Sequence, residues 1–225
     1  MNKTTHPNYL FNLIQLNLSI VLISTSGPLG RFIEVPIPIT IGSRAFLAAI
    51  VLLVFMKFKK IDFSLKKRDQ VTTYFSGLLM GIHWITYFYA LQLSSVAIGM
   101  LSLFTFPVIT AILEPLMLKT KASKVHLFLG LLVLVGIYFL VPQFDVSNTQ
   151  FKAVLFGVFS AVCYAVRNIM MKAKVHTYNG ATLMTHQLFM IAVCCIPFCF
   201  FLDLSKVWKF LPQTFLLAVL TTAAG

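Results

Sequence analysis

The side chains in this chain that could do chemistry are few, and their types suit the binding of a solute. His83 and Tyr87 stand four residues apart in one apolar run, so a helix would place both on one face. Arg44 and Tyr164 lie within two further apolar runs, and an arginine fork can hold a carboxylate through paired hydrogen bonds. Glu114, in a fourth run, could bind a proton or a cationic group. These five residues are the candidates for contact with a small-molecule solute.

Each candidate also has a structural interpretation that the sequence leaves open. His83 could hydrogen-bond a neighbouring helix, and Arg44 could extend its stem toward an aqueous interface. Glu114 could form a local ion pair near Lys119. Tyr164 belongs to a stripe of small and polar residues that is typical of a helix-packing face. The stripe comprises Gly157, Ser160, Ala161, Tyr164 and Asn168.

Glycines and prolines predict how the helices around these candidates pack. Gly77 and Gly81 form a G-x-x-x-G, the spacing that lets two helices approach closely. We expect this glycine face to pack against another helix and the face with His83 to border a cavity. Pro107 and Pro115 are expected to break or bend the helix that contains them, which frees backbone carbonyls.

No pattern in the chain supports catalysis, a metal or a cofactor. The five histidines form no H-E-x-x-H of a zinc protease, and Glu114 is the one carboxylate within an apolar run, so the acid pair of an aspartyl protease is missing. The four cysteines lie inside apolar runs without metal-ligand spacing, and no Walker-type phosphate loop occurs. We therefore expect no catalytic residue and no enzyme, with a serine–histidine pair as the arrangement left open.

The elements that must position the candidates are long apolar runs. The chain has 225 residues, of which 59% are hydrophobic and 11% charged, and this composition is far from that of a soluble domain. A hydrocarbon core about 30 Å thick is crossed by about 20 apolar residues in a helix. The runs of that length are 10–32, 36–56, 71–91, 96–118, 125–141, 151–171 and 181–202, and a partial run spans 212–225. The sequence therefore predicts an all-α, multi-pass helical membrane bundle.

The positive charge of the chain indicates orientation in a membrane. The net charge is +12, but the basic residues stand mostly between apolar runs, so we expect no nucleic-acid partner. With the N-terminus inside, thirteen of the 18 basic residues fall on the inner side. The outer five are Arg31, Arg44, Lys152, Lys206 and Lys209. The positive-inside rule thus predicts a cytoplasmic N-terminus. The membrane that we expect is the plasma or inner cell membrane.

Three stretches carry a resemblance to a known family. The stretch 88–99 (FYALQLSSVAIG) and the stretch 104–115 (FTFPVITAILEP) resemble the EamA-type drug/metabolite transporter superfamily. The stretch 130–136 (GLLVLVG) looks like the fifth helix of that family. Arg31 and Arg44 fall where the family often has basic residues in its first pair of helices.

The resemblance implies ten helices in two five-helix repeats, the second inverted in the membrane. Residues 10–141 would form the first repeat, and residues 151–225 an incomplete second one. Lys172 would then match Arg31 from the opposite face, and Gln187 would lie near the place of Arg44. The chain departs from the family in lacking an acidic residue after the fourth helix, and its end within an eighth run predicts a fragment.

The function that this resemblance implies is secondary transport of a small metabolite by alternating access, with export as the family's direction. The expected partners are the lipid bilayer and the solute, and a homodimer is left open. A structural or assembly membrane protein without transport is the alternative, followed by an intramembrane enzyme. The sequence does not identify the solute or a coupling ion.

Overall fold

The computed structural model of the chain describes residues 36–119, 124–140 and 148–199, together with residues 13–14, 16–18, 20–21 and 24. The regular secondary structure of these residues is helical, without a strand. The helices are α2 (Ile37–Lys59), α3 (Lys67–Leu93), α4 (Val96–Leu103), α5 (Phe106–Leu118), α6 (Lys124–Leu140), α7 (Thr149–Lys172) and α8 (Gly180–Cys199). Six predicted runs coincide with these helices, whereas the run 10–32 lies largely, and the run 212–225 wholly, outside the described residues.

Four segments are long and apolar enough to cross a membrane, namely α2, the joined α4 and α5, α7, and α8 as far as Phe198. Two other predicted runs do not meet that standard. The helix α6 has only 17 residues, and α3 contains polar residues such as Thr73, Ser76 and His83 that lower its mean hydropathy. Large apolar side chains on the outer surface, such as Phe128 and Phe139, are exposed, as lipid-facing side chains are. The chain is therefore an all-α, multi-pass membrane protein.

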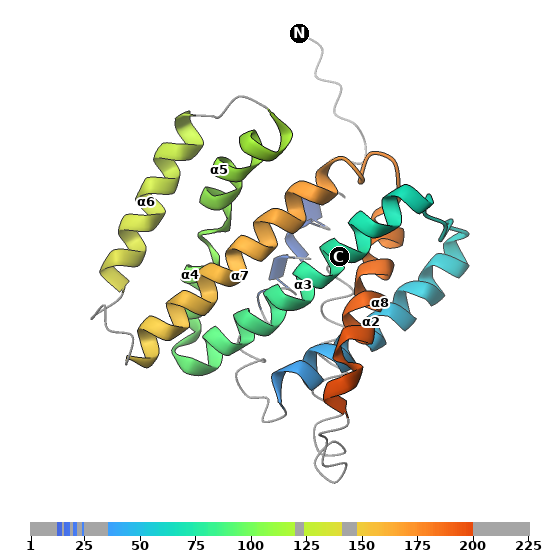
Figure 1. Cartoon of the computed structure of the whole chain (residues 1–225), viewed down its shortest axis with the longest axis horizontal. Helices are drawn as coiled ribbons and strands as arrows, with labels where there is room; N and C mark the ends of the chain where they lie inside the picture. Colours follow the sequence, from blue (N-terminus) through green and yellow to red (C-terminus); the bar gives the residue numbers. More distant parts are fainter. Residues whose placement is uncertain are drawn as a thin grey trace.

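The helices α3 and α7 run side by side through the middle of the bundle (Figure 1). The helix α8 packs against α3 and α2, and α5 packs against α7 and α6. A hydrophobic core lies between α2, α3 and α8, and includes Ile41, Ala45, Trp84, Phe88, Leu188 and Ile191. The helix α3 therefore faces α7 on one side and this core on the other.

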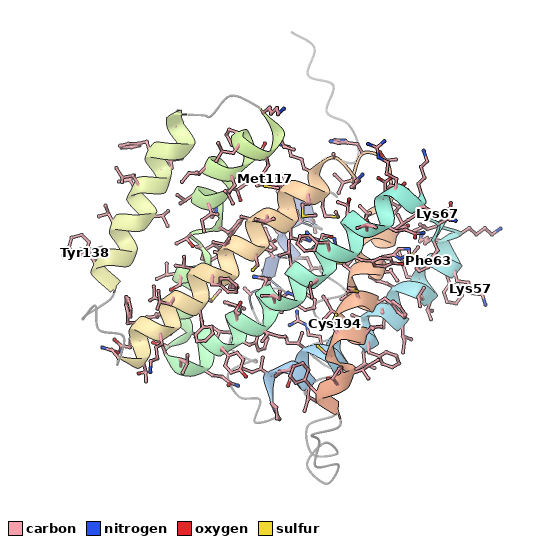
Figure 2. The ribbon with its side chains drawn as sticks, viewed as in Figure 1. Lys57, Phe63, Lys67, Met117, Tyr138 and Cys194 are labelled. Atoms are coloured by element: carbon pink, nitrogen blue, oxygen red, sulfur yellow. The ribbon has the colours of Figure 1, made fainter. Side chains whose placement is uncertain are left out.

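Basic residues gather at one end of the bundle, which we call the basic end. It comprises Lys57, Lys59, Lys60, Lys66, Lys67, Arg68, Lys119, Lys172 and Lys174. Figure 2 labels Lys57, Phe63 and Lys67 there. The connector 60–66 contacts the start of α8, since the Thr182 hydroxyl donates to the Asp62 carbonyl at 2.7 Å. The helices α2, α5 and α7 end here, and α3 and α8 begin here. The connectors that join them at this end carry the basic residues named above.

The fourth predicted run is interrupted in its middle. The helix α4 begins at Val96, where the Ser95 hydroxyl accepts the Ile98 N–H at 3.2 Å, and it ends at Leu103. The helix α5 begins at Phe106, with Pro107 in its first turn. Because Pro107 has no N–H, the Leu103 carbonyl cannot receive its usual helical hydrogen bond. The predicted break is thus observed near Pro107, whereas α5 continues through Pro115.

Candidate functional site

A buried hydrogen-bonded pair joins the two central helices. His83 of α3 is 5% exposed, and its Nδ1 lies 2.7 Å from the Oγ of Ser160 on α7, which is fully buried. The Ser160 hydroxyl donates its single proton to the His83 carbonyl at 2.9 Å. With this direction, Nδ1 is the donor toward Ser160. The pair links α3 to α7.

Aromatic rings surround the His83 imidazole. The Tyr164 ring of α7 stacks on it with a centroid distance of 4.7 Å, and the Tyr87 ring lies nearly parallel to it at 6.2 Å. Phe106, at the start of α5, meets Tyr164 edge to face at 5.0 Å. Three of the five predicted solute contacts, His83, Tyr87 and Tyr164, are thus brought together. Their flat faces are of the kind that bind aromatic or cationic groups.

Arg44 reaches the same level of the bundle from α2. Its guanidinium carbon lies 4.5 Å from the centroid of the Trp84 ring and 5.9 Å from that of Phe88, and the residue is 4% exposed. Arg44 therefore does not extend to an aqueous interface. Trp84 follows His83 directly in α3, and the two side chains face different neighbours: Trp84 packs in the core with α2 and α8, and His83 contacts α7.

The two glycines of α3 lie against α8. A Cβ added at Gly77 would come within 2.9 Å of Gln187 Cα and 3.0 Å of the Gln187 carbonyl oxygen. One added at Gly81 would lie 3.3 Å from Ile191 Cγ1. Close approach at Gly77 brings Gln187, which is fully buried, into reach of Ser76 of α3, and its Nε2 donates to the Ser76 hydroxyl at 2.7 Å.

Arg167 of α7 extends this polar layer, and sequence reasoning missed its role because it was counted only as an inner basic residue. Its Nη1 donates to Asn168 Oδ1 at 2.9 Å, and its Nη2 donates to Gln187 Oε1 at 2.5 Å. Its Nε is buried without a hydrogen-bond partner in the described part of the chain. The available signal was Arg167's place within an apolar run, three residues after Tyr164, on the same helix face.

Glu114 lies apart from the His83 site. It forms an ion pair with Lys172 at the end of α7, so the local pairing expected with Lys119 is replaced by a bond between α5 and α7. The Lys172 side chain is 57% exposed, and solvent screening leaves such a pair with little net stabilisation.

The basic end is closed by contacts between distant connectors, which we call the Asp69 cluster: Lys66, Asp69, Lys174 and Tyr178. Asp69 forms an ion pair with Lys174 and accepts the Tyr178 hydroxyl at 2.7 Å. The hydrogen bond from Lys174, followed by that from Tyr178, lowers the pKa of Asp69 below its ordinary value. The hydrogen bond to Asp69 raises the pKa of the Tyr178 phenol.

A histidine packs beside the Asp69 cluster. His186 stacks on Phe63 with a centroid distance of 4.2 Å, and its Nε2 lies 2.9 Å from the Phe63 carbonyl oxygen. These contacts hold the connector 60–66 onto α8 at the basic end. In the described residues, no group of three histidine, cysteine or acidic side chains could hold a metal ion.

Comparison with known proteins gives one result for the family. The sequence profile described as the EamA-like transporter family matches residues 11–141, which is more than half of the 225-residue chain. A comparison with curated proteins finds no match.

Proposed function

Because the chain belongs to the EamA-like transporter family, we propose that it is a secondary transporter that exports a small metabolite by alternating access. The family supports transport. The solute, the direction and the mechanism are our proposal.

The observation that carries the proposal is the polar and aromatic site formed by Arg44, His83, Tyr87, Ser160 and Tyr164. Polar groups at membrane depth are costly, and in membrane proteins they commonly mark solute pathways. This site lies on three helices, α2, α3 and α7, that an alternating-access movement can displace relative to one another. Glu114, near the basic end, is the weaker candidate because its carboxylate already pairs with Lys172.

We further propose that α7 and α8 begin a second, inverted repeat, with the site between the repeats. Inverted repeats with a solute site at their interface recur among secondary transporters. The packing of α2 on α8 and of α3 on α7 supports this arrangement, since each pair joins the two proposed repeats. The gathering of basic residues at one end supports a cytoplasmic location of that end, in a plasma or inner membrane.

The Asp69 cluster supports alternating access as the mechanism. It ties α3 to the connector between α7 and α8 at the basic end, so a pathway from the His83 site to that side requires its opening. The break between α4 and α5 lies beside Tyr164 through Phe106 and supplies a joint at which α5 can move.

The test is uptake by the purified chain in proteoliposomes. Radiolabelled amino acids, nucleosides and organic cations are offered, and we expect at least one to enter faster than in protein-free liposomes. His83→Ala removes the buried link to Ser160 and should lower that uptake about tenfold or more, which corresponds to about 1.4 kcal/mol. The matched control is His176→Ala, because His176 lies exposed in the connector 173–179.

Transport of these three solute classes is refuted if none of them enters while the reconstituted protein keeps its helical circular-dichroism spectrum. That outcome would favour the structural or assembly role. Equal loss of uptake in His83→Ala and His176→Ala would remove the His83 site from the mechanism but leave transport intact.

A further inference from the structure

Arg167 is held by two hydrogen bonds from its Nη atoms, while its Nε–H has no partner in the described part of the chain. Its two Nη atoms donate to Asn168 and Gln187, at 2.9 and 2.5 Å, and Gln187 is itself fixed by its bond to Ser76. The Nε is buried and has no partner in the part of the chain that the structure describes. A buried donor without an acceptor is costly, so such a group in a native protein calls for a ligand or an alternative partner.

The charge of Arg167 is also not neutralised by a described carboxylate. The described acids are Asp62, Asp69 and Glu114. Asp69 pairs with Lys174 and Glu114 with Lys172, while the Asp62 carboxylate accepts from Ser64 within its own connector. The two atoms to which Arg167 donates, on Asn168 and Gln187, are neutral amide oxygens. A charge at this depth needs a counter-charge, and the described protein offers none.

Arg167 lies next to the aromatic part of the proposed solute site. Tyr164 precedes it by three residues, so both side chains belong to one face of α7. The Tyr164 ring stacks on His83, and Arg44 lies over Trp84, the residue after His83. Flat aromatic surface therefore lies next to Arg167, and a second cation, Arg44, lies on the other side of α3.

We propose that Arg167 binds the carboxylate of the transported solute, and that an aromatic part of the same solute packs on Tyr164. This assignment rests on the proposed transport function and names its substrate class, an aromatic carboxylate. The Nε–H and a remaining Nη–H form the planar fork that a carboxylate accepts in bidentate fashion. Gln187 and Asn168 orient that fork, and the solute supplies the counter-charge that the described residues lack.

The test is thermal unfolding of the purified full chain in detergent with matched probes. The carboxylates are 3-phenylpropionate and indole-3-propionate, the neutral control is 3-phenylpropanamide, and the cationic control is phenethylamine. We expect both carboxylates to raise the melting temperature, and the amide and the amine to have no effect. Arg167→Gln removes the charge and should weaken carboxylate binding about tenfold or more. Lys152→Gln, at the exposed start of the same helix, should leave it unchanged.

Two results would overturn the assignment: stabilisation by the amide equal to that by the carboxylates, or no stabilisation by either carboxylate. If Arg167→Gln does not fold, Arg167→Lys keeps the charge and loses the fork, and unchanged carboxylate binding in that variant would equally overturn it. Uptake separates this failure from that of the transport proposal. A wild-type chain that moves a neutral or cationic solute at a rate unaffected by Arg167→Gln remains a transporter without a carboxylate site.

Discussion

At the scale of single residues, a few buried hydrogen bonds and two glycines decide how the central helices meet. His83 and Ser160 link α3 to α7, and Gln187 joins α8 to both of them through Ser76 and Arg167. Gly77 makes the bonds of Gln187 possible, because the missing side chain of Gly77 lets the Gln187 backbone lie against α3. Hydrogen bonds in this apolar setting have few competing partners, so the layer defines one register between the helices.

Gly77→Ala should therefore destabilise the bundle by about 1–3 kcal/mol, since the new Cβ would meet the backbone of Gln187 and not a flexible side chain. The measurement is the melting temperature of the purified protein in detergent. Gly136→Ala is the control: a Cβ there meets nothing within 4 Å, and alanine favours a helix over glycine by about 1 kcal/mol. Equal melting temperatures of the two variants would show that α8 withdraws from α3 at little cost.

The residues of the site could be predicted in part. His83, Tyr87, Tyr164 and Arg44 stood out because polar side chains are rare in apolar runs, and helical spacing put the first two on one face. Their partners could not be read, since Ser160 is 77 residues from His83 and pairing across helices leaves no local pattern. Arg167 was counted only among the basic residues on the inner side for the same reason: its acceptor Gln187 lies on another helix.

At the scale of elements, the contacts between connectors at the basic end are the feature that composition does not reveal. Positive charge predicted that these connectors share a side of the membrane, but it gave no reason for them to touch. Asp69 supplies that reason, because its carboxylate takes up Lys174 and Tyr178 from the connector between α7 and α8. By contrast, the break between α4 and α5 was predictable from Pro107 alone, since the missing N–H acts locally.

Asp69→Asn should loosen the connectors 60–66 and 173–179, which we expect to see at pH 7 as faster hydrogen–deuterium exchange of both. Asp62→Asn is the control, because the described hydrogen bonds of the Asp62 carboxylate come from Ser64 and Phe63 of the same connector. Exchange that is as slow in Asp69→Asn as in the wild type would show that the cluster does not hold the two connectors together.

The pH dependence of the same cluster follows from its pKa shifts. The pKa of Asp69 is lowered, so its contribution is present above the ordinary carboxyl pKa of about 4 and is lost as the pH falls through the lower folded value. The pKa of Tyr178 is raised, so its contribution is present below about 10 and is lost as the pH rises through the higher folded value. Protection of both connectors in the wild type, taken as exchange relative to the intrinsic rate at each pH, should therefore stay high across neutral pH and fall below about 4.

At the scale of the whole molecule, the candidate site extends beyond the part of the chain that the family profile matches. The family match covers the helices up to α6, and the site draws on α7 as well as on α2 and α3. A five-helix unit cannot build this site without the helices that follow it. The proposed solute pathway is thus a property of the bundle as a whole.

Orientation in the membrane can be tested with Lys67→Cys, at the basic end, and Lys152→Cys, at the opposite end of the bundle; both positions are exposed. In sealed cells, a membrane-impermeant maleimide should label Lys152→Cys directly and Lys67→Cys only after permeabilisation. The unmodified chain is the control for its four native cysteines. The opposite labelling pattern would place the basic end outside and overturn the cytoplasmic assignment.

The number of residues in the break between α4 and α5 determines how the two helices are rotated relative to each other. The helix α4 has 8 residues and α5 has 13, so neither can cross the hydrocarbon core, and the two share a single passage through it. A residue inserted at Phe104 or Thr105 would turn α5 by about 100° relative to α4. That rotation would carry Glu114 away from Lys172 and Phe106 away from Tyr164. We therefore expect an insertion or a deletion at this joint to break both contacts, whereas a substitution there would leave the two helices in register.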